Sequence, residues 1–151
     1  AAPRAVDVAA NGNKFEPEVI QVTEPGQALR LGKDDLFRVQ VHWKNPRDGS
    51  EGTGYAQRLA DDSGAFWFFS RDNLEVTVKI LDGRGVNRHW WVFIASMTDL
   101  EMTVTVLQNR NDCLSLPTVP PSCPTMTYSQ AAGQNRNYVD IGAFSEGGGE
   151  P

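Results

Sequence analysis

The chain has 151 residues, which is the size of one domain with a single hydrophobic core, and 40% of them are hydrophobic, which excludes a wholly disordered chain. Its 14 Gly and 9 Pro disfavour a helical bundle. The formal charge of -5 offers no basic face for a phosphate backbone, so we expect no nucleic-acid partner.

The first elements in chain order are an arm, a hairpin and a strand. Residues 1–14 are small and polar and are expected to form an extended N-terminal arm. Two short β-prone runs at 19–22 and 28–31, separated by Pro25-Gly26, predict a hairpin. Apolar and polar residues alternate over 36–43, which predicts a half-buried strand.

The rest of the chain reads as a series of short strands. A loop is expected at 45–54 and another at 82–88, and strands are expected at 55–59, 66–69, 74–81, 89–95, 102–106, 125–128 and 138–144. Since no segment has a 3.6-residue apolar period, we predict an all-β chain, an immunoglobulin-like antiparallel β-sandwich over residues 15–144. The Pro-rich stretch 108–124 predicts an irregular excursion, and residues 145–151 a flexible tail.

The two cysteines bear on the cellular compartment. Cys113 and Cys123 lie in the Pro-rich stretch without a nearby His, which favours a local disulfide over a metal site. The start at Ala1-Ala2-Pro3 resembles what signal cleavage leaves behind, although an omitted initiator Met explains it equally well. We therefore expect a secreted, periplasmic or cell-surface protein. No apolar stretch is long enough for a transmembrane segment.

Two strands break the alternation of apolar and polar residues. In 66–69 and 90–94 both alternating sets are apolar, so one set places rings on the face away from the core. One explanation is that the N-terminal arm or the cysteine-bearing excursion covers these rings, or that both strands lie between two layers. The other is a binding face for a sugar ring, a hydrophobic peptide or another subunit. Its candidate residues are Trp67, Phe69, Trp91 and Phe93, with Trp67 and Trp91 assigned to the outer set.

The acidic and nucleophilic residues give no clear catalytic or metal motif. Asp61, Asp62 and Asp72 are candidate calcium ligands, but they match no fixed template and are ordinary turn formers. Both His42 and His89 precede a Trp on an expected strand, and no Gly-x-Ser-x-Gly sequence occurs. We therefore expect no cofactor, no calcium requirement and no enzymatic activity.

The segment 13–22, with Gly26, resembles the opening hairpin of cupredoxins. A blue-copper centre needs two His and a Cys, and no His follows either cysteine here. The resemblance to cupredoxins is therefore rejected, and we expect no copper site.

A second resemblance covers residues 36–144. Its principal motifs are Phe66-Trp67-Phe68-Phe69, Asp72-Asn73-x-Glu75, Val78-Lys79-x-Leu81-Asp82-Gly83 and Asn87-x-His89-x-Trp91-Val92-Phe93. In these the chain is similar to a recurrent β-sandwich domain of secreted bacterial proteins, which accompanies other extracellular modules and has no established activity. The resemblance implies secretion and a β-fold. The excursion after Gln108 departs from the short hairpin of that domain.

These features predict a non-enzymatic extracellular module for binding or assembly. Its aromatic sheet face is expected to contact a protein partner or a cell-surface glycan. One alternative is a calcium-dependent carbohydrate binder or small secreted hydrolase using Asp61, Asp62 and Asp72, which requires these acids to converge. Another is an accessory subunit of a larger extracellular or membrane-associated assembly.

Overall fold

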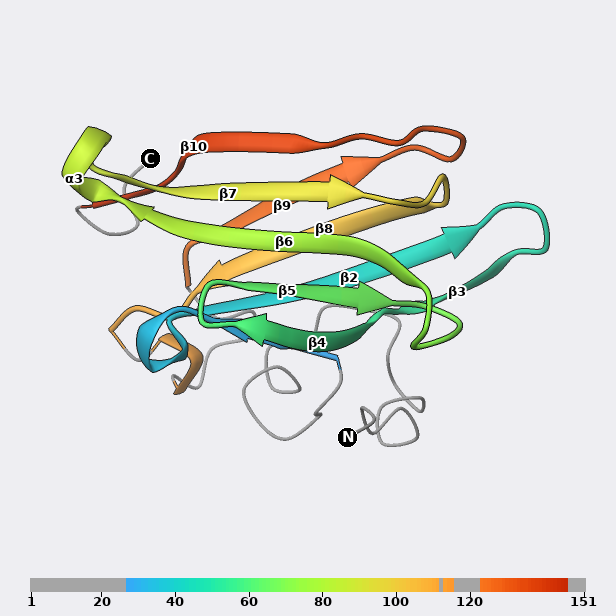
Figure 1. Ribbon diagram of the computed structural model, residues 1–151, viewed down its shortest axis with the longest axis horizontal. Coiled ribbons are helices and arrows are strands. Elements are labelled where there is room, and N and C mark those ends of the chain that lie inside the picture. The colour runs from blue at the N-terminus through green and yellow to red at the C-terminus, as the bar shows by residue number, and fades with distance from the viewer. Residues whose placement is uncertain (1–26, 112, 116–122, 147–151) are drawn as a thin grey trace.

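Two five-stranded antiparallel sheets pack face to face in the computed structural model of the chain (Figure 1). The structure describes residues 27–111, 113–115 and 123–146. Sheet A consists of β1 (Leu29–Leu31), β2 (Phe37–Asn45), β3 (Ser50–Thr53), β8 (Glu101–Gln108) and β9 (Thr125–Gln130). Sheet B consists of β4 (Tyr55–Ala60), β5 (Ser63–Trp67), β6 (Leu74–Gly83), β7 (His89–Ser96) and β10 (Tyr138–Ser145). The expected all-β antiparallel sandwich is confirmed.

The order of the strands shows how the chain fills the two sheets. Sheet A has the order β1-β2-β8-β9, with β3 also paired to β2, and sheet B has the order β10-β7-β6-β5-β4. The four strands β4 to β7 form a meander, because each pairs with the next along the chain. The last strand, β10, returns from sheet A to pair with β7.

Two segments differ from the sequence predictions. The expected loop at 45–54 contains β3, and the expected loop at 82–88 contains the short helix α3 (Arg84–Asn87). The strand was missed because its sequence, Ser-Glu-Gly-Thr, has no apolar alternation. Gly52 of this strand lies close to β2: a Cβ there would lie 3.1 Å from the Trp43 ring, so a larger residue would require the ring to shift slightly.

Other predicted segments fall partly or wholly outside the described residues. The arm at 1–14, the first half of the hairpin at 19–22 and the tail from 147 onward lie there, so the structure does not test them.

Short 3-10 turns are present at η1 (Lys33–Asp35) and η2 (Cys113–Ser115). No helix among the described residues has the length and apolar character needed to span a membrane.

The core lies between the sheets and takes one alternating set from each of the long strands β2, β6, β7 and β8. It includes Val39 and Val41 of β2, Val104 and Val106 of β8, Val76 and Val78 of β6, and Val92 and Ile94 of β7, all 2% exposed or less. Aromatic rings fill the remaining width: Phe37 lies 5.0 Å from Trp90 and 5.3 Å from Phe144, between ring centroids. Burial of these branched and aromatic side chains is the main source of stability.

Two tyrosines join the edges of the sheets at β9 and β10. The Tyr128 hydroxyl donates to Asp140 Oδ2 at 2.7 Å, and the Tyr138 hydroxyl donates to the Ser129 carbonyl at 2.6 Å. Burial, together with the Asp140 carboxylate, raises the pKa of Tyr128. The Tyr128 hydroxyl therefore keeps its proton and remains a donor.

The disulfide predicted between Cys113 and Cys123 is present, with Cα atoms 5.3 Å apart. Both cysteines pack with Leu107 and Leu114 in a small apolar cluster separate from the main core. Leu107 lies on the outer side of sheet A, because its neighbour Val106 points into the core. The described part of the excursion therefore packs on the outer side of sheet A, and residues 116–122 of the excursion lie outside the described residues.

Candidate functional site

The structure settles which aromatic set faces outward on β5 and β7. Phe66 and Val92 are fully buried between the sheets, whereas their neighbours Trp67 and Trp91 are absent from the core cluster and lie on the opposite side of sheet B. The assignment of Trp67 and Trp91 to the outer set is confirmed. Trp90, the residue before Trp91, points to the inner side of sheet B and packs against Phe37.

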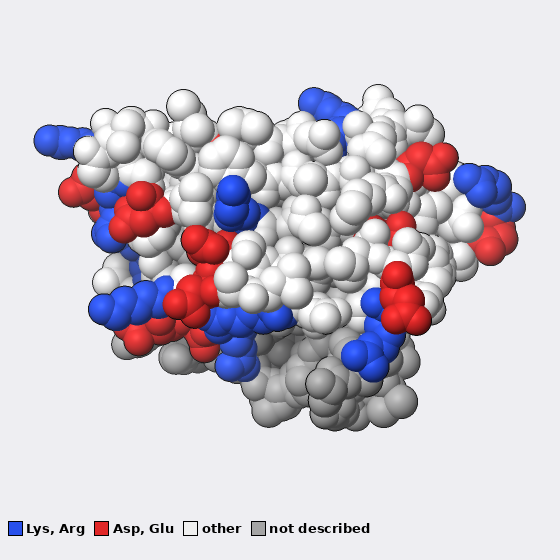
Figure 2. All heavy atoms as spheres, viewed as in Figure 1, with Lys and Arg blue, Asp and Glu red and all other residues white. Residues whose placement is uncertain are grey.

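The side of sheet B that points away from sheet A is termed the outer face. The strand register places Phe93 between Lys79 and Val139, and it places Trp91 beside Leu81. Apolar side chains on the strands of this sheet are well exposed: Val139 at 72%, Ile141 at 51% and Leu59 at 58%. Figure 2 looks onto this sheet and shows a broad uncharged area, with most charged side chains toward its margins.

The indole of Trp91 is held flat against the sheet. A Cβ on Gly83 would lie 2.1 Å from the indole, so the ring occupies the space directly above that glycine. The indole Nε1 donates to Asn87 Oδ1 at 2.9 Å, and Asn87 Nδ2 donates to the Ile141 carbonyl at 2.8 Å. Asn87 thus links α3, β7 and β10 and fixes the ring without a ligand. A ring fixed in advance loses little conformational entropy when a partner stacks on it.

Replacing Asn87 with Ala should test this positioning. The variant loses the hydrogen bonds that Asn87 makes with the indole, the Ile141 carbonyl and the His89 amide, so we expect a loss of about 1 to 2 kcal/mol in the free energy of unfolding. Urea unfolding measures it, with Val86→Ala as the control, because Val86 lies on the same helix and is 78% exposed. Equal stability of both variants would show that Asn87 does not hold the indole.

A groove of about 520 Å³ crosses the outer face. Residues from all five strands of sheet B or their immediate flanks line it, among them Leu59, Ser63, Thr77, Lys79, Phe93 and Val139. Its floor is low at Ala95, whose side chain is a single methyl group. Gly64 pairs with Val78 and faces the core. Gly64 cannot be enlarged, since a Cβ there would lie 2.5 Å from a Leu29 methyl carbon and 2.8 Å from the Gln57 carbonyl oxygen.

The lining of the groove includes one positive side chain, Lys79, and no negative one. The Lys79 ammonium lies 5.3 Å from the centroid of the Phe93 ring. None of the lining residues is acidic. The arrangement suits a ligand with apolar surfaces and some negative charge.

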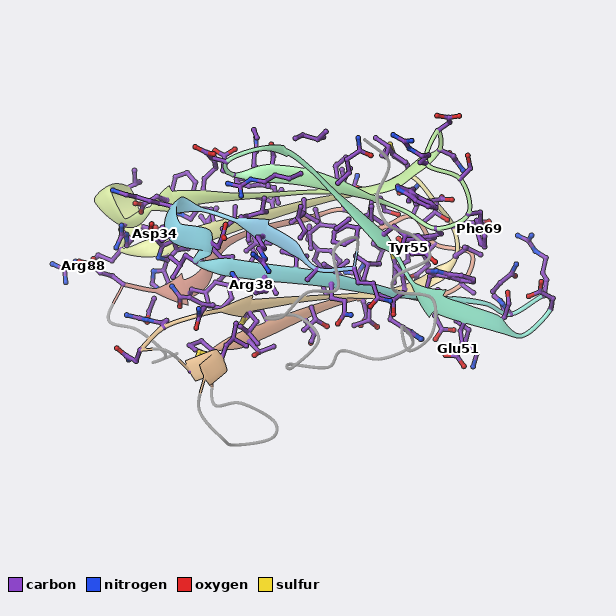
Figure 3. The ribbon with its side chains drawn as sticks, turned by 90° about the horizontal axis from the view of Figure 1, so that it is seen from below. Asp34, Arg38, Glu51, Tyr55, Phe69 and Arg88 are labelled. Carbon is purple, nitrogen blue, oxygen red and sulfur yellow. A yellow bond between two sulfur atoms is a disulfide. The ribbon has the colours of Figure 1, made fainter. Side chains whose placement is uncertain are left out.

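The structure brings together only two of the four candidate aromatic residues. Trp91 and Phe93 lie on the outer face one pleat apart, and Trp67 shares that side but is only 7% exposed and packs 4.3 Å from Tyr55. Phe69 follows β5, is 57% exposed and contacts the Trp43 ring at 4.8 Å. Figure 3 shows Phe69 at the end of the sandwich opposite Arg88, the residue that follows α3.

The three candidate calcium ligands do not converge. Asp61 and Asp62 form the turn between β4 and β5, whereas Asp72 lies in the turn at the other end of β5. The Asp61 carboxylate pairs with Arg58 at 3.2 Å. Within the described ranges, no group of three or more His, Cys, Asp or Glu side chains is placed to hold a metal ion.

One buried carboxyl lies on β6 beyond the groove. Glu75 is 6% exposed, and Asn73 Nδ2 donates to its Oε2 at 3.1 Å. Burial raises the pKa of Glu75, the nearby Asp99 adds to the rise, and a hydrogen bond with Thr98 opposes it. The native chain therefore holds this proton to a higher pH than the unfolded chain does.

The raised pKa of Glu75 predicts a pH-dependent loss of stability. The contribution is present below the pKa of the unfolded chain, and it is lost as the pH rises through the higher pKa of the native chain. Glu75→Gln resembles the protonated form, so its stability relative to the natural chain should grow between about pH 4 and pH 7. Urea unfolding of both proteins at several pH values measures the difference. A difference independent of pH would contradict the raised pKa.

Several residues of this surface were not predicted from the sequence. Lys79, Gly83 and Asn87 stand in the motifs noted above, but nothing in their spacing showed that they meet around Phe93 and Trp91. Leu59 and Val139 come from the two edge strands of sheet B, far apart in the sequence.

Comparisons with protein-family models, with curated proteins and with solved structures find no match to this chain.

Proposed function

We propose that the protein is a non-enzymatic extracellular binding or assembly module whose outer face of sheet B contacts a protein partner or a surface glycan. One observation carries the proposal. The core is filled by the inner set of side chains, yet the outer face presents Trp91 and Phe93 beside a groove that crosses the sheet. Aromatic side chains in such positions commonly supply most of the binding energy of a surface.

The alternatives based on Asp61, Asp62 and Asp72 have less support. Both require the acids to converge, and the two turns that hold them lie at opposite ends of β5. The disulfide is compatible with an extracellular location, as is the absence of a membrane-spanning helix from the described residues. The resemblance to a domain of secreted bacterial proteins implies the same location and names no activity.

A binding screen with a matched pair of variants tests the proposal. The natural chain, Phe93→Ala and Val86→Ala are compared against purified surface polysaccharides and envelope proteins. Loss of the Phe93 ring should raise the dissociation constant of the true ligand about tenfold or more. Val86→Ala should have no effect, because this exposed residue lies on α3, away from the groove.

The outcome against the proposal is equally specific. If every ligand found binds Phe93→Ala as tightly as the natural chain, the outer face is not the contact surface. Circular dichroism of Phe93→Ala must show a folded protein, so that lost binding reports the surface and not the fold.

A further inference from the structure

The acidic groups of sheet B are all engaged away from the groove. The strands of this sheet contain three acids, Glu75, Asp82 and Asp140. Glu75 is bonded to Asn73, Asp82 pairs with Arg84 at 2.8 Å, and Asp140 accepts from Tyr128 at 2.7 Å. In a chain with a net charge of -5, the groove is thus a local site without negative charge.

The cation at the centre of the groove has no acidic partner. No carboxylate of the described residues lies within 4.0 Å of Lys79 Nζ, whereas Arg30, Arg47, Arg58 and Arg84 all have one. Lys79 stands beside Phe93 on the neighbouring strand, and its ammonium is 5.3 Å from that ring. A ligand that lies against Phe93 therefore comes within reach of a single positive charge.

The shape of the groove favours an extended ligand that runs across the strands. Five strands span four interstrand spacings, or about 19 Å. The central strands are paired on both sides, so a peptide lying here cannot add to the sheet by backbone hydrogen bonds. The ligand must be recognised by side chains alone.

The polar groups of the groove match the hydroxyl pattern of a sugar chain. The hydroxyls of Ser63 and Thr77 have no hydrogen-bond partner among the described residues. Asn137 Oδ1 accepts from the Ser96 amide at 2.9 Å, which leaves its Nδ2 available to a ligand. A pyranose ring presents an apolar C–H face to an aromatic ring and hydroxyls along its edge, and Phe93 with these small polar groups offers the complement of both.

We infer that the groove binds an extended acidic oligosaccharide, with a sugar ring against Phe93 and a carboxylate on Lys79. The inference rests on the proposed function and names the ligand class of that surface. The repeating uronic acids of a cell-surface polysaccharide have this chemistry.

Calorimetric titration of the full chain tests the ligand class. The probes are oligogalacturonate, oligomannuronate and a neutral cello-oligosaccharide of equal length. We expect at least one acidic probe to bind about tenfold more tightly than the neutral one, and raising the salt concentration should weaken it. Lys79→Gln should weaken the acidic probe about tenfold, Lys79→Arg should largely restore it, and Val86→Ala should leave it unchanged.

Three results would overturn the inference. They are equal binding of the neutral probe, unchanged affinity in Lys79→Gln, and no binding of either acidic probe to the natural chain. The Phe93→Ala variant distinguishes a wrong ligand class from a wrong binding surface. If the neutral probe or a protein ligand binds and loses affinity in Phe93→Ala, the surface is correct and only the acidic ligand class is wrong.

Discussion

Replacing Phe66 with Ala should lower the free energy of unfolding by about 3 to 5 kcal/mol. Phe66 is fully buried, lies opposite Val76 of the neighbouring strand and belongs to the main core. The truncation removes a large apolar side chain and leaves a cavity, because close-packed neighbours relax only in part. Phe93→Ala, on the outer face, should cost less than about 1 kcal/mol, since it opens no core cavity.

Urea unfolding followed by circular dichroism measures both changes. A 151-residue domain has a total stability of about 5 to 15 kcal/mol, so Phe66→Ala can fall below the stability needed to fold. In that case Phe66→Leu serves as a milder variant, with a smaller but clear loss. Similar losses at Phe66 and Phe93 would show that both aromatic sets belong to the core, and the outer face would lose its role.

Removing the disulfide should lower the free energy of unfolding by about 2 to 3 kcal/mol through loop-closure entropy. Cys113 and Cys123 are ten residues apart, and both pack with Leu107 and Leu114. The double variant Cys113→Ser with Cys123→Ser can be compared with the reduced natural chain, because the sequence has no other cysteine.

The disulfide variant also tests whether the excursion on sheet A contributes to ligand binding. The described part of the excursion lies on sheet A, so the variant should be less stable but bind as the natural chain does. Thermal unfolding and the titrations described above measure the two properties on the same samples. Unchanged stability, or an affinity that falls with the disulfide, would contradict this separation.

The strands were predictable from the sequence because each leaves a local pattern. Val39 with Val41, and Val76 with Val78, alternate with polar residues, and the period of two follows directly from strand geometry. Most of the predicted strands are confirmed within a few residues. The segment Ser50–Thr53 left no such pattern, because its strand is defined by backbone pairing to β2 at the edge of the sheet.

The candidate surface was only partly predictable. The doubly apolar segments at 66–69 and 90–94 showed that rings lie outside the core, and the structure confirms the outward placement of Trp67 and Trp91. The burial of Trp67 against Tyr55 and the separation of Phe69 depend on how distant segments pack. The groove depends on residues of all five strands of sheet B, or of their flanks, meeting on one face, which no local pattern records.

The most direct test of the account is the location of ligand contacts on the molecule. Backbone amide shifts in the NMR spectrum of the labelled chain are recorded as the tightest ligand of the screen is added. We predict that the largest changes fall on β6, β7 and β10 around Lys79, Phe93 and Val139, and that Phe93→Ala requires about tenfold more ligand, or more, to produce them. Changes confined to sheet A, or to the end of the sandwich that holds Phe69, would contradict the account.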